Sequence, residues 1–121
     1  MGKIEKFEDI KVWQRARKIV KVIYDVSKKG EFSQDFKFRA QIRDAGVSII
    51  ANIAGGFGRR SDKEFANFLN YSHASCAEVQ SHLYVALDQE YITKDLFENI
   101  YDECDEISRM IISFQTYLRK S

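Results

Sequence analysis

Apolar residues recur at three- and four-residue steps in four segments of the chain, which is the spacing of one face of an α-helix. A first helix is predicted from about residue 9 to 29, with Asp9 as its N-cap and Gly30 as its stop. A second helix is predicted from about 35 to 54. The apolar stripes are Val12, Ala16, Ile19, Ile23 and Val26 in the first helix, and Phe38, Ile42, Ala45, Ile49 and Ile53 in the second.

Two further segments carry heptad seams, and each follows a capping residue. Ser61 and Glu64 have the spacing of a capping box, in which the serine accepts the Glu64 amide and the glutamate bonds back to the amide of the cap. The third helix therefore runs from Ser61 to about 88, and Thr93 caps the fourth. The seams are Phe65, Leu69, Ser72, Cys76, Val79, Leu83 and Ala86, then Phe97, Ile100, Cys104, Ile107, Ile111, Phe114 and Leu118.

The chain contains no proline, so nothing breaks these segments, and the links between them are short. Short links between long amphipathic helices favour antiparallel neighbours. The sequence therefore predicts an all-α fold, an antiparallel up-down-up-down four-helix bundle, formed by residues 1–121 as a single domain.

The composition is that of an ordinary globular protein, with 45% apolar and 31% charged residues. No stretch has the length and apolar character of a membrane span or of a signal peptide, so we expect a cytoplasmic protein with no membrane partner. Cys76 and Cys104 occupy apolar seams in a chain without secretory features, which favours reduced core thiols over a disulfide.

Charge is distributed unevenly along the chain. Residues 1–63 hold 15 Lys and Arg against 8 Asp and Glu, whereas residues 64–121 hold 4 against 10. The cations of the first helix lie opposite its apolar stripe at 100° per residue and form a basic face. The candidate nucleic-acid-binding residues are Lys11, Arg15, Arg17, Lys18 and Lys21, with Arg43, Arg59 and Arg60 as further candidates. The same charges also suit contact between copies, or plain solvation.

No catalytic residues, metal ligands or cofactors are predicted. His73 and Cys76 lie three residues apart, which supplies only two of the three or four protein ligands that zinc requires. His73 and His82 belong to no pattern that resembles a catalytic triad. We therefore expect a protein that is not an enzyme.

The segment GGFGRRS, residues 55–61, is predicted to form the turn between the second and third helices. It follows a helix instead of a strand, unlike the known phosphate-binding loops. Two alternatives stay open: an anion bound by the free amides with Arg59 and Arg60, or a tight turn whose glycines adopt positive φ.

The run from Ala45 to Gly58 contains no charged residue, and Val47 and Ala54 lie on the flank away from the stripe. A helix that is apolar or small nearly all round is expected to be covered on both sides. In a four-helix protein the second cover is another subunit or a bound partner, so the sequence predicts a homo-oligomer or a protein partner.

Three stretches resemble a known family: FEDIKVWQRA at 7–16, QIRDAGVSIIANIAGGFGRRSDKEFANFL at 41–69, and Ser75 with Glu78. They are similar to the four helix bundle protein family, also called the S23 or 23S rRNA intervening-sequence protein family. The resemblance implies a ring-like homopentamer. It also implies a relationship to accessory proteins of diversity-generating retroelements, in which a basic surface binds nucleic acid.

The residues of the family motif are predicted to organise the turn between the second and third helices: Asn52, Gly56, Gly58, Arg59, Ser61 and Glu64. The chain departs from the family pattern at Ile50, which is usually proline, at Gly55, which is usually glutamate, and at Asp44, which is often basic. The leading hypothesis is a non-enzymatic oligomeric scaffold that binds RNA or DNA through the basic face. The alternative is a self-assembling protein-interaction module without a nucleic-acid role.

Overall fold

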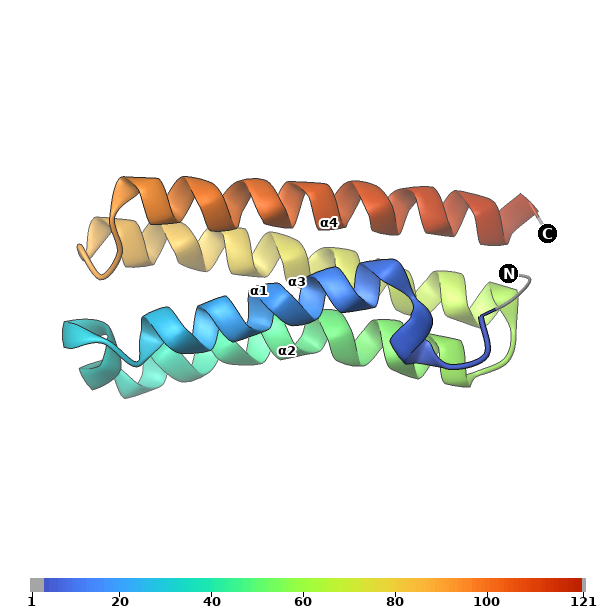
Figure 1. The fold of residues 1–121 in the computed structure, drawn as a ribbon, viewed down its shortest axis with the longest axis horizontal. Helices are drawn as coiled ribbons and strands as arrows, with labels where there is room; N and C mark the ends of the chain where they lie inside the picture. The colour runs from blue at the N-terminus through green and yellow to red at the C-terminus, as the bar shows by residue number, and fades with distance from the viewer. Residues whose placement is uncertain (1–3, 121) are drawn as a thin grey trace.

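Four long helices make up most of the computed structural model, which describes residues 4–120. The helices are α1 at Lys11–Ser27, α2 at Phe36–Gly58, α3 at Asp62–Asp88 and α4 at Lys94–Lys120, with short 3-10 helices η1 at Phe7–Asp9 and η2 at Gly30–Gln34. Successive helices run in opposite directions and lie side by side (Figure 1). No strand occurs in residues 4–120, and the predicted all-α four-helix bundle is confirmed.

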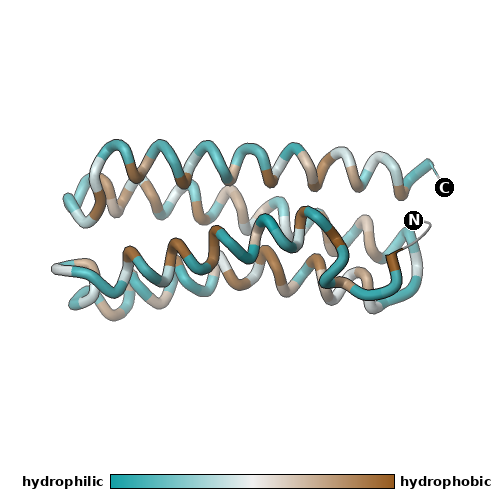
Figure 2. Tube along the Cα trace, viewed as in Figure 1, coloured by the Kyte–Doolittle hydropathy of each residue, from teal (hydrophilic) through white to brown (hydrophobic). Residues whose placement is uncertain are grey.

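The four helices share one apolar core, and the brown positions in Figure 2 recur along each of them. α2 packs most extensively against α3, and α3 against α4, whereas α1 packs mainly on α2 and only lightly on α4. Nearly all predicted stripe and seam residues are buried. Val26 and Phe114 are only half-buried, and Ser27 and Gln115 take buried positions beside them.

Side-chain caps fix the starts of three helices. Ser61 Oγ accepts the amide of Glu64 at 3.3 Å, and Thr93 Oγ1 accepts the amide of Leu96 at 3.2 Å, as predicted. The second half of the predicted capping box is replaced, because the Glu64 carboxylate pairs with Arg59 at 3.2 Å. Asp35 caps α2 through the amide of Phe38 at 3.3 Å. The prediction that Asp9 caps α1 is wrong, because Asp9 belongs to η1 and Ile10 occupies the cap position without a side-chain bond.

The glycine-rich segment is helical, which corrects the predicted turn. Gly55, Gly56 and Gly58 all belong to α2, and only residues 59–61 separate α2 from α3. The positive φ of this connection belongs to Arg60, at 60°, and to none of these three glycines. Gly56 is buried against Phe65 and Phe68 of α3, where close helix packing leaves no room for a side chain.

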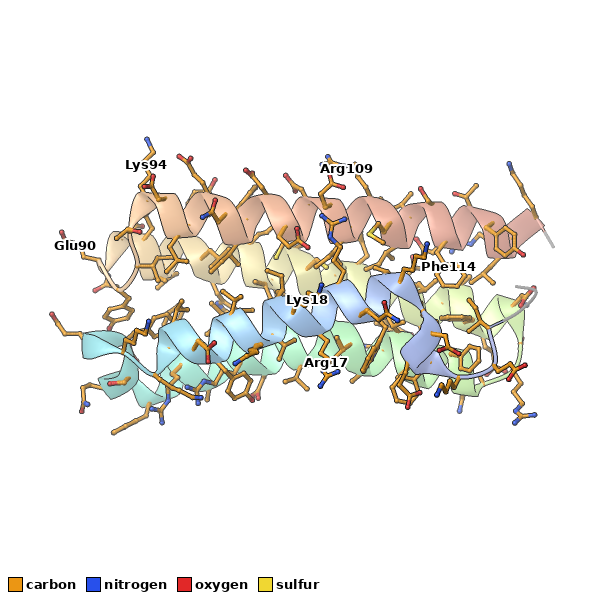
Figure 3. The ribbon with its side chains drawn as sticks, viewed as in Figure 1. Arg17, Lys18, Glu90, Lys94, Arg109 and Phe114 are labelled. Carbon is orange, nitrogen blue, oxygen red and sulfur yellow. The ribbon has the colours of Figure 1, made fainter. Side chains whose placement is uncertain are left out.

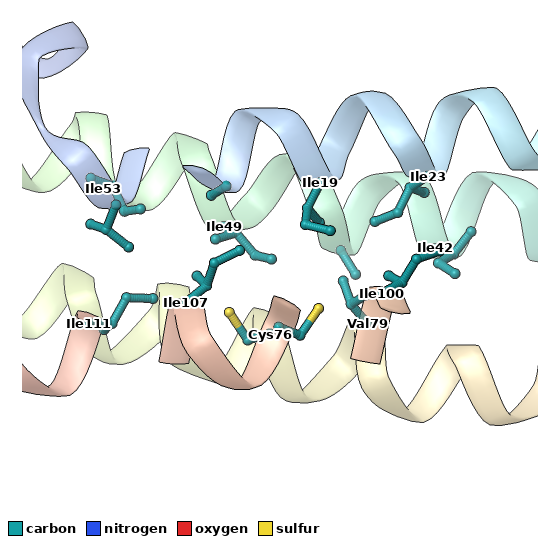
Figure 4. Close-up of a cluster of buried hydrophobic side chains, with 14 of the residues drawn as sticks. Ile19, Ile23, Ile42, Ile49, Ile53, Cys76, Val79, Ile100, Ile107 and Ile111 are labelled. Atoms are coloured by element: carbon teal, nitrogen blue, oxygen red, sulfur yellow. The ribbon is translucent and has the colours of Figure 1, made fainter. Parts of the chain in front are cut away.

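Cys76 lies in the core among isoleucine side chains (Figure 4), and Cys104 is buried in the same core. Cys76 on α3 and Cys104 on α4 are free thiols with no exposed surface. Burial raises the pKa of Cys76 to about 11 and also raises the pKa of Cys104. Because thiolates are the reactive form, both residues act as core hydrophobes in the folded protein.

We expect neither thiol to react with Ellman's reagent at pH 8 in the folded protein, and both to react once denaturant unfolds it. The unfolded thiol ionises near pH 9, whereas folded Cys76 ionises near pH 11. The neutral buried thiol therefore contributes its full stability below about pH 9, and this contribution falls as the pH rises from 9 towards 11. Rapid reaction of two thiols per folded chain at pH 8 would contradict this account.

Candidate nucleic-acid interface

A shallow hollow of about 510 Å³ follows the exposed side of α1. It is lined by Glu8, Trp13, Gln14, Arg17, Lys18 and Lys21. Five of these residues have the spacing i, i+1, i+4, i+5 and i+8, so two adjacent turns of one helix place an indole, an amide and three cations on one surface. We call these five residues, Trp13, Gln14, Arg17, Lys18 and Lys21, the α1 surface.

Trp13 forms the apolar floor of the α1 surface. Its ring is half-buried and meets the edge of Phe7, with 5.0 Å between ring centroids, and the Arg17 guanidinium carbon lies 5.9 Å from the Trp13 centroid. Arg17 and Lys18 leave the helix on opposite edges of its ribbon (Figure 3). Lys21 makes a 3.3 Å ion pair with Asp25, but its side chain is 78% exposed, so this pair leaves it free to meet a ligand.

Arg15 does not belong to this surface, which corrects the predicted basic face. Its Nε lies 2.6 Å from Oε2 of Glu103 on α4, and its Nη2 lies 3.0 Å from Oε1, so the guanidinium and the carboxylate form a bidentate pair. The hydrogen bond and charge of Glu103 raise the pKa of Arg15. Arg15 joins α1 to α4 across the most loosely packed seam of the bundle.

Arg43 and Arg59 are also engaged within the protein. Arg43 donates to Ser27 Oγ at 2.8 Å and stacks on the ring of Tyr24, and thereby joins α2 to the end of α1. Arg59 lies 3.2 Å from Glu64 and stacks on Phe68, 5.3 Å from its ring centroid.

The two remaining predicted cations lie outside the α1 surface. Lys11 is exposed at the start of α1 and lines a different hollow, between α1 and α4. Arg60 is exposed in the connection between α2 and α3. Of the eight candidate residues, the structure therefore brings together Arg17, Lys18 and Lys21.

The predicted motif spans the end of α2, the connection and the start of α3, and only Arg59 and Ser61 belong to the connection itself. Ser61 caps α3, and Glu64 pairs with Arg59 across the connection. Gly58 is the last residue of α2. Asn52 does not take part in the turn: its amide donates to the carbonyl and hydroxyl oxygens of Ser48, one turn earlier in α2.

Another hollow, of about 570 Å³, lies between the start of α1 and α4. Its walls are mainly apolar, with Ile10, Val12, Met110 and Phe114 among them, and the two charged residues of α4 on its rim, Glu106 and Arg109, pair with each other at 2.9 Å. Within residues 4–120, no three His, Cys, Asp or Glu side chains converge as metal ligands.

Trp13 and Gln14 are the site residues that the sequence analysis missed. Trp13 lies beside the apolar stripe of the first helix and was not counted among the candidate residues, although it stands four residues before Arg17 and eight before Lys21. An aromatic residue in register with two cations is the signal that points to a mixed stacking and ionic surface.

These features define a class of protein: an antiparallel four-helix bundle with a basic, tryptophan-containing groove on its first helix. The sequence profile of the 23S rRNA-intervening sequence protein family matches residues 8–113. The chain belongs to this family.

A solved structure supports the same assignment. It is the crystal structure of a protein of unknown function from the S23 ribosomal protein family of Bacteroides thetaiotaomicron, 27% identical in sequence, with a TM-score of 0.77. The alignment covers 86% of this chain and 97% of the other. No curated protein matches the chain. Among residues 4–120, no helix combines the length and hydropathy of a membrane span.

Proposed function

We propose that this protein is a non-enzymatic, oligomeric scaffold of the cytoplasm that binds RNA or DNA through the α1 surface. The observation that carries the proposal is the exposed hollow that Trp13 lines together with Arg17, Lys18 and Lys21, with the Arg17 guanidinium carbon 5.9 Å from the Trp13 ring centroid. Cations bind the phosphate backbone, and an aromatic ring stacks with any base. This combination supports a ligand that is both anionic and aromatic.

The α1 surface is suited to binding with little sequence preference. Its cations contact phosphates, which position a nucleic acid without reading its sequence. The apolar face of α1 packs in the core. On the exposed side, Trp13 and Gln14 are the two residues of the α1 surface that are left to contact bases. A single-stranded segment, whose bases are free to stack, suits this surface better than a duplex.

Three cations per chain give weak binding, and repeated sites strengthen it by raising the effective concentration. Self-association is supported by the outer surface of α2 and α3, where Val47 is 38% and Tyr71 59% exposed beside the uncharged run of α2. We infer that this surface contacts other copies. A ring of five, as the family resemblance implies, would repeat the α1 surface around one particle.

The alternative function is a self-assembling protein-interaction module without a nucleic-acid role. The Arg15–Glu103 pair favours it, because one cation of α1 is already engaged by a carboxylate of α4 and is not free for a phosphate. The near-neutral net charge of +1 favours it as well, since dedicated nucleic-acid binders are usually strongly basic.

The chain contains one tryptophan, so intrinsic fluorescence reports on the α1 surface directly. Titration with an unlabelled 20-nucleotide single-stranded RNA, and with DNA of the same sequence, is expected to quench Trp13 emission at about 50 mM salt. The logarithm of affinity should fall with the logarithm of salt with a slope of about −2, from three contacts at about −0.7 each per chain. Binding seen by anisotropy with unchanged Trp13 emission would place the ligand elsewhere, and no binding at tens of micromolar would favour the alternative.

A further inference from the structure

A second surface with opposite charge lies on α3 and α4, away from the α1 surface. Three aromatic rings meet there: Tyr84 lies 4.9 Å from Phe97 and 5.9 Å from Tyr101, and Phe97 lies 5.4 Å from Tyr101, measured between centroids. Phe97 is buried, whereas Tyr84 is 52% exposed and Tyr101 half-buried. The core therefore continues outward into an aromatic platform that faces solvent.

The helix that carries Phe97 and Tyr101 is rich in carboxylates along the same stretch. Residues 95–106 of α4 contain six Asp and Glu and no Lys or Arg. Three of the six have partners in the protein: Glu103 pairs with Arg15, Glu106 pairs with Arg109, and Asp105 accepts from Gln80 at 2.8 Å.

The other three carboxylates, Asp95, Glu98 and Asp102, are exposed, and none forms an ion pair with a cation of residues 4–120. Glu98 and Asp102 stand four residues apart on one helix face, an arrangement of like charges that destabilises an isolated helix. A cationic ligand that met both would remove this repulsion.

The platform itself favours cations of one kind. The faces of tyrosine rings attract guanidinium and ammonium groups, and the planar guanidinium also stacks on the ring. Gln80 bonds to both Asp105 and the carbonyl of Tyr101, at 2.8 and 3.3 Å, and so holds α3 and α4 in register beneath the rings. A preformed surface of this kind binds without a large ordering cost.

We propose that the aromatic platform of Tyr84, Phe97 and Tyr101, with Glu98 and Asp102 beside it, binds an arginine-rich segment of a partner protein. Arginine side chains stack on Tyr84 and Tyr101 while their charges meet the two carboxylates. The scaffold thus carries two independent surfaces, one for nucleic acid on α1 and one for a basic protein on α3 and α4.

The test uses the full-length protein and two fluorescein-labelled peptides, nona-arginine and nona-lysine, at about 50 mM salt. We expect nona-arginine to bind more tightly than nona-lysine, since the two have equal charge but differ in stacking. Tyr84→Gln should weaken nona-arginine binding about threefold to fivefold and reduce its preference over nona-lysine. The double variant E98Q/D102N should weaken the binding of both peptides about tenfold.

The matched control removes two exposed carboxylates at the other end of the bundle, E5Q/E8Q, and should change both affinities less than about twofold. Equal weakening by both double variants, equal binding of the two peptides, or no saturation at tens of micromolar would overturn the proposal. A lower molar mass of E98Q/D102N in light scattering would also overturn it, because the surface would then contact another copy. Quenching of Trp13 emission by RNA should be unaltered in Tyr84→Gln. The peptide-binding proposal can therefore fail while the nucleic-acid proposal stands, and the reverse.

Discussion

Replacement of Gly56 by alanine is expected to lower the free energy of unfolding by about 2–4 kcal/mol. A Cβ atom at this position would lie 2.7 Å from Cβ of Phe68 and 2.8 Å from Cδ1 of Phe65. Because Cβ of Phe68 is fixed to its backbone, the clash is relieved only if α2 and α3 move apart. These two helices form the most extensive contact in the bundle, so the cost far exceeds the helix propensity that alanine gains.

Gly58 provides the matched control two residues later. A Cβ atom there meets nothing within 4 Å, so Gly58→Ala should be neutral or up to about 1 kcal/mol more stable. Urea denaturation followed by circular dichroism at 222 nm, at one protein concentration, measures both variants. A Gly56→Ala protein as stable as the wild type would show that α2 and α3 do not pack as closely as the structure places them.

The same glycines show why sequence reasoning placed the end of α2 too early. Glycine has a weak intrinsic helix propensity, and the run GGFG has the composition of a turn. In the folded protein, Phe65 and Phe68 of α3 pack directly against α2 at Gly56, where any side chain would clash with them. This packing extends α2 to Gly58. The left-handed conformation then falls on Arg60, whose position is fixed by the Ser61 cap that follows it.

The heptad seams were predictable because their spacing alone decides which residues face inward. Cys76 and Cys104 were correctly assigned to the core for this reason. Side-chain partners across helices were not predictable in the same way. The helical wheel placed Arg15 on the outer face, but its length lets it reach Glu103, and that contact depends on how α4 lies beside α1.

For the candidate site, the sequence identified the cations of α1 but not which of them share a surface. Arg43 and Arg59 stack on aromatic rings of the protein itself, and a sequence does not distinguish such arginines from free ones. Only the structure shows that the Trp13 ring contacts both Phe7 and Arg17. Arg17, Lys18 and Lys21 are therefore the residues on which the nucleic-acid proposal depends.

Charge reversal within the α1 surface is expected to have the largest effect on nucleic-acid binding. In R17E/K18E, two favourable phosphate contacts are replaced by two repulsive ones. The affinity for single-stranded RNA should therefore fall on the order of 30-fold at about 50 mM salt. The slope of log affinity against log salt should become shallower by about 1.4, at about 0.7 for each lost contact. Both side chains are exposed, and neither forms a hydrogen bond or ion pair with another helix within residues 4–120, so we expect unchanged helicity.

The most direct measurement compares R17E/K18E with R119E/K120E, which reverses another adjacent Arg–Lys pair in the last turn of α4. Both variants change the net charge equally, so only the position of the charges differs. Fluorescence anisotropy with labelled single-stranded RNA should show the large loss in R17E/K18E and a change of less than about threefold in R119E/K120E. Equal losses in both variants, or wild-type affinity in R17E/K18E, would contradict the claim that the α1 surface binds nucleic acid.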